Sequence, residues 1–440
     1  MAWHGVHGPA LPSGVAGLAP ALVYLRLRNC PALRTLADDV LSLTRLQQLR
    51  IKDCHELSAL PSALGTMVQL LQLRVKRCPK LTQLPESTSQ LTALIRFEVG
   101  GCTALCTLPA LGGMQQLTHL DLSDCLHLSM LPDDLPQLAR LAKLYIGAKA
   151  TTEFGVHAPV PSGPMRLQQL PANLAGLRCL SVLCVAGCPG LTRLPDALGA
   201  LSSLETLQLE HCGLKILPNS LCDLPVIKRL SVVCCCDLTQ LPGNLEHMTT
   251  LRWLELSGCT ALSELPASLC NLTRLESLYI RGEDHDGADV PAMVALTALP
   301  GNIGRLTALR ELNLSGCERL TALPPSARDL VLLHYLDVDV DSLPQPDWLE
   351  DHVSLITVFT NEPDEAAEHR IKTLVERNTS LRDARQGVLA LVLADRRRSP
   401  AAAGPGRIPP EMWQMVHDQL WADCLRGAPQ AARQSKPWRF

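Results

Sequence analysis

The sequence has few aromatic rings, no long apolar run and no strong net charge. Phe, Trp and Tyr make up 3% of its 440 residues, so leucine must supply most of the core. No apolar segment approaches the ~20 residues that cross a bilayer. A formal net charge of -3 lacks the basic excess of a general nucleic-acid or anionic-membrane binder. We therefore expect no nucleic acid and no membrane among its partners.

Several motifs that carry chemistry are also missing. No C-x-x-C pair occurs, which excludes the usual zinc-ribbon and thioredoxin patterns. No nucleophile elbow, H-E-x-x-H or paired-carboxylate arrangement stands out. The segment Met1–Pro9 lacks the charged and apolar regions of a secretory signal. We predict a non-catalytic protein without cofactor or metal that works inside a cell, not necessarily the cell that made it.

The sequence does contain a phrase, LxxLxLxxCxxLxxLPxxLxxLxx, that returns about every 24 residues from Leu22 to Leu332. Such a period marks a solenoid, in which each unit buries its apolar side against its neighbours. LxxLxL has the period of a short parallel strand, and LPxxLxxL that of a helical or 3-10 turn opened by proline. We predict an α/β solenoid, curved, with a concave parallel sheet and convex turns. Its thirteen strands should begin at Leu22, Leu46, Leu70, Leu94, Leu117, Leu141, Leu180, Leu204, Ile227, Leu251, Leu275, Leu309 and Leu333.

Ten of the 18 cysteines share one position of the phrase and form a cysteine ladder. Thiols that project in parallel from neighbouring strands do not meet disulfide geometry. We interpret them as small buried side chains at the turn that leaves each strand, which indicates a reducing compartment. The ladder residues are Cys30, Cys54, Cys78, Cys102, Cys125, Cys188, Cys212, Cys235, Cys259 and Cys317.

The repeats should span residues 11–360, between an N-terminal lead-in at 1–10 and a helical tail at 361–440 that contains a linker at 395–410. Either the lead-in caps the first strand, or the natural chain has more sequence upstream. Insertions at about 147–164 and 281–295 replace the turn after a strand, so both should emerge from one rim. They are either part of a binding face or simply tolerated in solvent.

The leucine spacing, the Leu-Pro step and the cysteine ladder together resemble the plant-type leucine-rich repeats of intracellular immune receptors. They also resemble leucine-rich-repeat type III effectors of plant-pathogenic bacteria. The resemblance covers roughly residues 11–360 and implies a horseshoe that binds proteins. The receptors' G-x-x-x-x-G-K-[ST] loop is absent, which favours the effector-like group acting in a host cytoplasm. Effector ubiquitin ligases add a large domain with a reactive cysteine; only Cys424 follows the repeats, so that activity is not carried over.

One fragment of the tail, Ile408–Leu420, resembles the opening helix of an F-box, whose partner is an adaptor of ubiquitin ligases. The alternative is a plain capping helix, because too few residues follow for the rest of that module. A third reading makes the chain a fragment of a larger receptor or effector.

The outward positions of the first strands are basic and should stack into one strip. This basic strip consists of Arg26, Arg28, Arg50, Lys52, Arg74, Lys76, Arg77 and Arg96. Stacked like charges repel, so we favour a role in docking a protein with an acidic patch over an indifferent solvated face. Later strands are acidic there, at Asp121, Glu210, Glu255, Glu311, Asp337 and Asp339.

Four aromatic residues should share the same face, namely Tyr145, Trp253, Tyr279 and Tyr335. They are either anchors for a partner or local covers of the strand edges. Two weaker patterns are set aside. Residues 283–289 resemble a calcium loop but have Ala295 where a glutamate is needed. Cys234–Cys236 lack further ligands at metal-binding spacing.

Overall fold

The computed structural model describes residues 2–4, 8, 21–36, 38–147, 163–282, 290–338 and 357–359. By its internal contacts the chain divides into two compact units, Met1–Ala394 and Asp395–Phe440. All the described residues lie in the first unit. The predicted tail and linker, most of the first insertion and residues 283–289 of the second lie outside them, so the predicted domain boundaries stay predictions.

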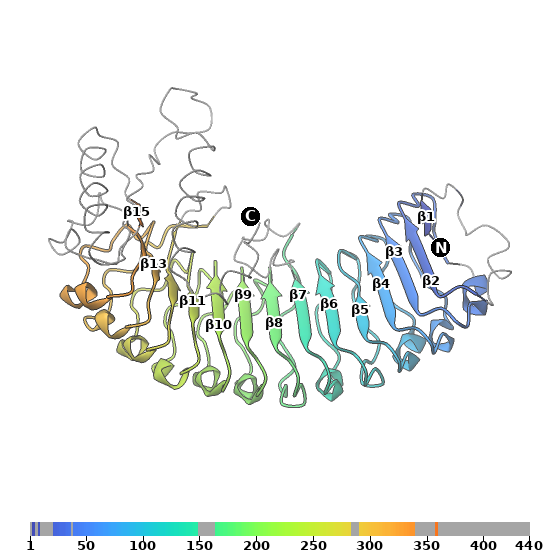
Figure 1. The fold of residues 1–440 in the computed structure, drawn as a ribbon. Helices are drawn as coiled ribbons and strands as arrows, with labels where there is room; N and C mark the ends of the chain where they lie inside the picture. The colour runs from blue at the N-terminus through green and yellow to red at the C-terminus, as the bar shows by residue number, and fades with distance from the viewer. Residues whose placement is uncertain are drawn as a thin grey trace, which may run out of the picture. The chain divides into compact units, whose positions relative to one another are not determined.

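A parallel sheet of fifteen strands runs through the described residues, and each strand pairs with its neighbours in chain order (Figure 1). Strands β2–β14 each begin two residues after a predicted start, which confirms the thirteen-strand sheet; β1 extends it at the lead-in and β15 at the other end. The strands are β1 Ala2–His4, β2 Tyr24–Arg28, β3 Gln48–Lys52, β4 Gln72–Lys76, β5 Arg96–Glu98, β6 His119–Ser123, β7 Lys143–Gly147, β8 Val182–Ala186, β9 Thr206–Glu210, β10 Arg229–Val233, β11 Trp253–Glu255, β12 Ser277–Tyr279, β13 Glu311–Asn313, β14 Tyr335–Asp337 and β15 Thr357–Phe359.

Short 3-10 turns form the layer opposite the strands, on the outer side of the curve in the first unit (Figure 1). Pro85 and Pro195 show how the Leu-Pro step works: each is extended and stands just before the turn, and its carbonyl accepts the first hydrogen bond. No helix in this part of the chain is long and apolar enough to cross a bilayer. The turns are η2 Asp38–Ser42, η3 Leu64–Thr66, η4 Glu86–Gln90, η5 Leu135–Gln137, η6 Asp196–Ala200, η7 Asn219–Asp223, η8 Leu245–His247, η9 Ala267–Asn271, η10 Ile303–Arg305 and η11 Pro325–Asp329.

The core is one continuous leucine-rich cluster between the strand layer and the turn layer, reaching from Leu25 to Val338. On β3, Leu49 and Ile51 are fully buried in it, whereas Arg50 between them is only half-buried. This alternation follows from the two-residue period of a strand. It leaves every second strand residue on the open face of the sheet.

A left-handed residue precedes each of the ten ladder cysteines, a feature that the sequence analysis misses. Asn, Asp and Gly, which tolerate this conformation best, occupy seven of these positions. The cysteine that follows turns inward, and six of the thiols donate to a carbonyl of the preceding strand or its end, such as Cys259 Sγ to Val232 O at 3.3 Å. The ten left-handed residues are Asn29, Asp53, Arg77, Gly101, Asp124, Gly187, His211, Cys234, Gly258 and Gly316.

Candidate functional site

Strand pairing aligns the outward residues of the sheet into columns that cross the strands. The central column begins with Arg26, Arg50 and Arg74, each directly opposite the next. The column beside it, toward the strand ends, begins with Arg28, Lys52 and Lys76. Because neighbouring strands lie ~4.8 Å apart, six cations of the basic strip are adjacent across β2, β3 and β4.

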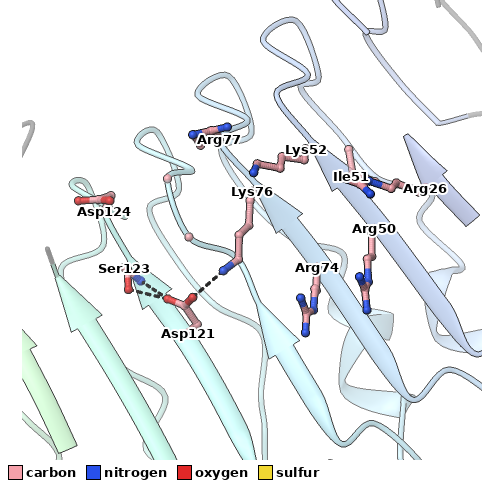
Figure 2. Close-up of a pocket in the computed structure, with 12 residues that line it drawn as sticks. Arg26, Arg50, Ile51, Lys52, Arg74, Lys76, Arg77, Asp121, Ser123 and Asp124 are labelled. Atoms are coloured by element: carbon pink, nitrogen blue, oxygen red, sulfur yellow. Dashed lines mark hydrogen bonds and ion pairs between the residues drawn. The ribbon is translucent and has the colours of Figure 1, made fainter. Parts of the chain in front are cut away.

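These columns line a hollow of about 410 Å³ on the strand face, shown in Figure 2. Half of the lining residues are basic and two are acidic, so the hollow presents mainly donors to a ligand. The lining residues are Arg26, Arg50, Ile51, Lys52, Arg74, Lys76, Arg77, Gly100, Gly101, Asp121, Ser123 and Asp124.

Glu98 on β5 ends the central run of arginines, and the sequence analysis misses it. It pairs in register with Arg74 and is buried. Its carboxylate oxygens lie 2.6 Å from Lys76 Nζ, 3.2 Å from Arg74 Nε and 3.7 Å from Arg96 Nη1. The expected uninterrupted basic strip is therefore partly neutralised from within. The 24-residue spacing from Arg74 to Glu98 could have revealed this partner.

Asp121 on β6 fixes Lys76 from the other side. The Lys76 ammonium donates to Asp121 Oδ2 at 2.9 Å, and Ser123 donates its backbone N–H and its hydroxyl to Oδ1. Burial disfavours both charges, but their mutual attraction outweighs it, so the pKa of Lys76 is raised and the pKa of Asp121 is lowered. Lys76 is thus a structural cation as much as a surface one.

The first two strands of the strip are different, because Arg26, Arg50 and Lys52 make no ion pair within the described residues. Arg50 Nη2 donates to Gln48 Oε1 at 3.1 Å and Gln72 Oε1 at 3.2 Å. Its Nε is buried and makes no hydrogen bond to the described part of the chain. Partial burial, and then repulsion from Arg77, lower the pKa of Lys52. This end of the hollow has an excess of positive charge.

Arg77 stands on the rim of the hollow, in the turn after β4 rather than on a strand. Its φ of 55° is left-handed, a conformation that costs a residue with a Cβ about 1 kcal/mol or more. Its guanidinium holds Asp53, donating from Nη2 to Oδ2 at 3.0 Å, and Arg28 Nε lies 3.7 Å from the same carboxylate. Asp53 therefore neutralises the rim, not the floor.

The structure brings together two of the four predicted aromatic anchors. The rings of Trp253 and Tyr279 stack with centroids 4.7 Å apart, and Arg229 lies 5.2 Å from the centre of the Trp253 ring. Tyr335 on β14 lies two strands beyond Tyr279, and Tyr145 on β7 five strands before it. All four are half-buried.

The carboxylates of the later strands are held by neighbouring hydroxyls and amides. Glu311 accepts from Ser277 and from the Tyr279 hydroxyl, Glu255 from Ser231, and Asp337 from Asn313. Glu210 differs, since burial and then repulsion from Glu255 raise its pKa to about 7. Asp339 lies outside the described residues.

The ladder cysteines are all buried, and none of them forms a disulfide with another described cysteine. Burial raises the pKa of Cys125 to about 12, which suppresses the reactive thiolate. No cluster of three or more metal-ligand side chains occurs within residues 21–147, 163–282 and 290–338. The calcium-like segment 283–289, the F-box-like segment at Ile408–Leu420 and Cys424 lie outside the described residues.

The fold and its repeat define a leucine-rich-repeat solenoid, and the comparisons agree. Residues 163–295 match the family model described as a leucine-rich repeat region. A leucine-rich-repeat protein of Leptospira interrogans is 20% identical with a TM-score of 0.58, covering 84% of this chain and 92% of its own. The described part of the chain thus has the fold of a leucine-rich-repeat solenoid.

Two further solved structures are similar to this chain at low sequence identity. A TDR receptor is 20% identical with a TM-score of 0.51, covering 84% of this chain and 62% of the receptor. The leucine-rich-repeat domain of the type III effector XopL is 24% identical over 72% of this chain and 76% of its own, but its TM-score of 0.29 is too low to support an argument. No curated protein matches the sequence.

Proposed function

We propose that this leucine-rich-repeat protein is a binding module that docks an acidic patch of a protein partner on the basic strip. Leucine-rich-repeat domains typically bind proteins and are usually non-catalytic. The observation that carries the proposal is the group of Arg26, Arg50 and Lys52, which line the hollow and make no ion pair with any described residue. A fold gains nothing from stacking like charges across strands, whereas an acidic partner would relieve the repulsion and be steered toward it.

The test is the kinetics of partner binding after reversal of Arg26 and Arg50 to Glu. The partner would first be captured with the full chain as bait. Reversal should slow association about tenfold or more at low salt and weaken the salt dependence, because steering acts on the on-rate. Arg50 with Arg26 is a cleaner pair than Arg50 with Arg74, because a glutamate at position 74 would also face Glu98.

Arg193→Glu is the matched control, since Arg193 is an exposed arginine outside the strip and should leave the on-rate nearly unchanged. If the double reversal leaves both rate constants and their salt dependence untouched, the basic strip is only a solvated face. Trp253→Ala should act differently, through faster dissociation, if its stacked ring is an anchor.

We further propose that the chain is an effector-like protein acting in the reducing interior of a host cell. Support comes from the resemblance of its repeats and cysteine ladder to those of bacterial effectors. A translocation reporter fused to the chain would test this in bacteria with and without an active type III secretion system. Equal reporter signal in the two strains would contradict the proposal.

A further inference from the structure

We propose that the hollow receives a phosphoryl group, so that the acidic patch of the partner is a phosphorylated segment of its chain. This inference rests on the proposed function and names the chemistry of the partner. It is argued from the kind of cation in the hollow, the way the chain neutralises the neighbouring cations, and the size of the hollow.

The central column offers arginine forks at strand spacing. Arg26 and Arg50 come from adjacent strands ~4.8 Å apart, and Lys52 lies beside Arg50 in the next column. A guanidinium binds phosphate through two parallel N–H donors. A carboxylate has two oxygens and one negative charge, whereas a phosphorylated side chain has three terminal oxygens and a charge of about -1.5 to -2 at neutral pH. It can therefore accept hydrogen bonds from more than one of these cations at once.

The other end of the strip shows what one carboxylate can satisfy. Glu98 lies within ion-pair distance of Arg74, Lys76 and Arg96, and Asp121 adds a second negative charge at Lys76. Two carboxylates thus serve three cations on β4 and β5. Among the described residues, the acid that pairs with the cations of β2 stands at the rim, where Asp53 holds Arg77 and Arg28. An external anion with about two charges would complete the same balance.

The buried Nε of Arg50 is a donor that an external anion could use. It makes no hydrogen bond to the described residues, although Nη2 of the same guanidinium has two acceptors. Most buried donors in folded proteins are paired, so an anion that reaches this atom would supply an acceptor that the described residues do not. Lys52 would also gain from an anion, because burial and then the neighbouring cations lower its pKa, and a bound anion would offset the repulsion from those cations.

The hollow is larger than one anion requires and poorly equipped for nucleic acid. Its volume of about 410 Å³ lies within the ~300–1,000 Å³ of ligand sites, so it has room for a phosphorylated side chain and its flanking residues. Bases would need free aromatic rings to stack on. Tyr24 borders this region, but Arg50 already lies over its ring at 5.4 Å. A phosphopeptide suits these surroundings better than an oligonucleotide.

The test compares three fluorescein-labelled heptapeptides with identical glycine-serine flanks and a central phosphoserine, glutamate or serine. Binding to the full chain is followed by fluorescence anisotropy at low salt. The phosphoserine peptide should bind about tenfold more tightly than the glutamate peptide, and pyrophosphate should compete with it. The double variant Arg26→Gln with Arg50→Gln should abolish the preference, whereas Arg193→Gln should retain it.

Arg50→Lys separates charge from the fork geometry of the guanidinium. It keeps the positive charge but loses the paired donors, so the preference for phosphoserine should fall severalfold while glutamate binding stays nearly constant. Unchanged melting temperatures would show that both glutamine variants fold.

Equal binding of the phosphoserine and glutamate peptides would overturn the inference, as would a preference that survives the double variant. Tighter binding of a single-stranded oligonucleotide of equal charge would overturn the assignment to a peptide. Failure of the phosphate inference can be told apart from failure of the proposed function. If partner capture still depends on Arg26 and Arg50, docking on the basic strip stands without phosphate. Loss of that dependence would refute docking itself.

Discussion

The two ends of the strand face use one backbone register for opposite electrostatic arrangements. On β2 and β3, cations stack in adjacent columns, and within the described residues Arg26, Arg50 and Lys52 make no ion pair with an acid. On β11–β14, Glu255 and Asp337 stand in the central column and Glu311 in a neighbouring column. These carboxylates accept hydrogen bonds from hydroxyl or amide groups, as Glu311 does from Ser277 and Tyr279.

The difference separates a surface whose charged groups are stabilised by the fold itself from one whose charges would be stabilised by a ligand. A buried carboxylate that accepts several hydrogen bonds stabilises the fold without any partner. The Tyr279 hydroxyl is already used in this way, so part of the predicted aromatic anchor is structural. A cation group without acids gains nothing for the fold, and its charge is available to an external anion.

The largest expected effect is the difference in stability between two lysine variants, one at Lys76, which is paired with acids, and one at Lys52 in the same column. Lys76→Met should destabilise the protein by about 3–4 kcal/mol, because it leaves the buried Glu98 and Asp121 without their shared cation. Lys52→Met changes the same column one strand earlier, where no acid pairs with it, and should cost under about 0.5 kcal/mol. Urea midpoints of both variants measure the contrast; equal losses would abolish the proposed distinction.

A smaller effect concerns Glu210 on β9, whose carboxylate is buried near Glu255. The pKa of Glu210 is raised to about 7 in the fold, so the folded state binds its proton more tightly than the unfolded state does. This group should therefore lower stability as pH rises from about 4.5 to 7, and the full penalty above this range is roughly 3 kcal/mol.

Glu210→Gln removes the titration and should stabilise the protein at pH 8 by that amount while having little effect at pH 4. Melting temperatures of both proteins across this range provide the measurement. Parallel pH profiles for the two proteins would show that the Glu210 carboxyl ionises normally.

The smallest effect should be the same at both ends, because the cysteine ladder runs beneath both. Cys125→Ser and Cys259→Ser should each cost about 1 kcal/mol or less, since the serine hydroxyl can use the carbonyl that now accepts from the thiol. In native thiol labelling, the exposed Cys106, Cys179 and Cys236 should react, and the ladder only after unfolding. Ladder residues that stay blocked after unfolding without reductant would contradict free thiols.

Much of the fold could be predicted because each repeat has the same spacing of leucine and proline. The positions of β2–β14 follow from the Leu-x-Leu alternation, and the opposite layer follows from the Leu-Pro step, since both depend on contacts between adjacent repeats. The left-handed residues before the cysteines could have been predicted in the same way, because the residue types at Asn29, Gly101 and Gly258 are typical of that conformation. Arg77 and Cys234 at equivalent positions obscure the pattern.

The sequence by itself determined which residues point outward, and hence that the first strands are basic and the later ones acidic. Only the tertiary structure decided which charges neutralise each other. Glu98 reaches Lys76 and Arg74 on the adjacent strand, Asp121 reaches Lys76 two strands away and 45 positions along the chain, and Asp53 pairs with Arg77 at the rim. Apart from the in-register pair of Arg74 with Glu98, such pairings depend on side-chain reach and burial across strands, and a repeat period does not encode them. The hollow and its unneutralised cations are what remains after those pairings are made.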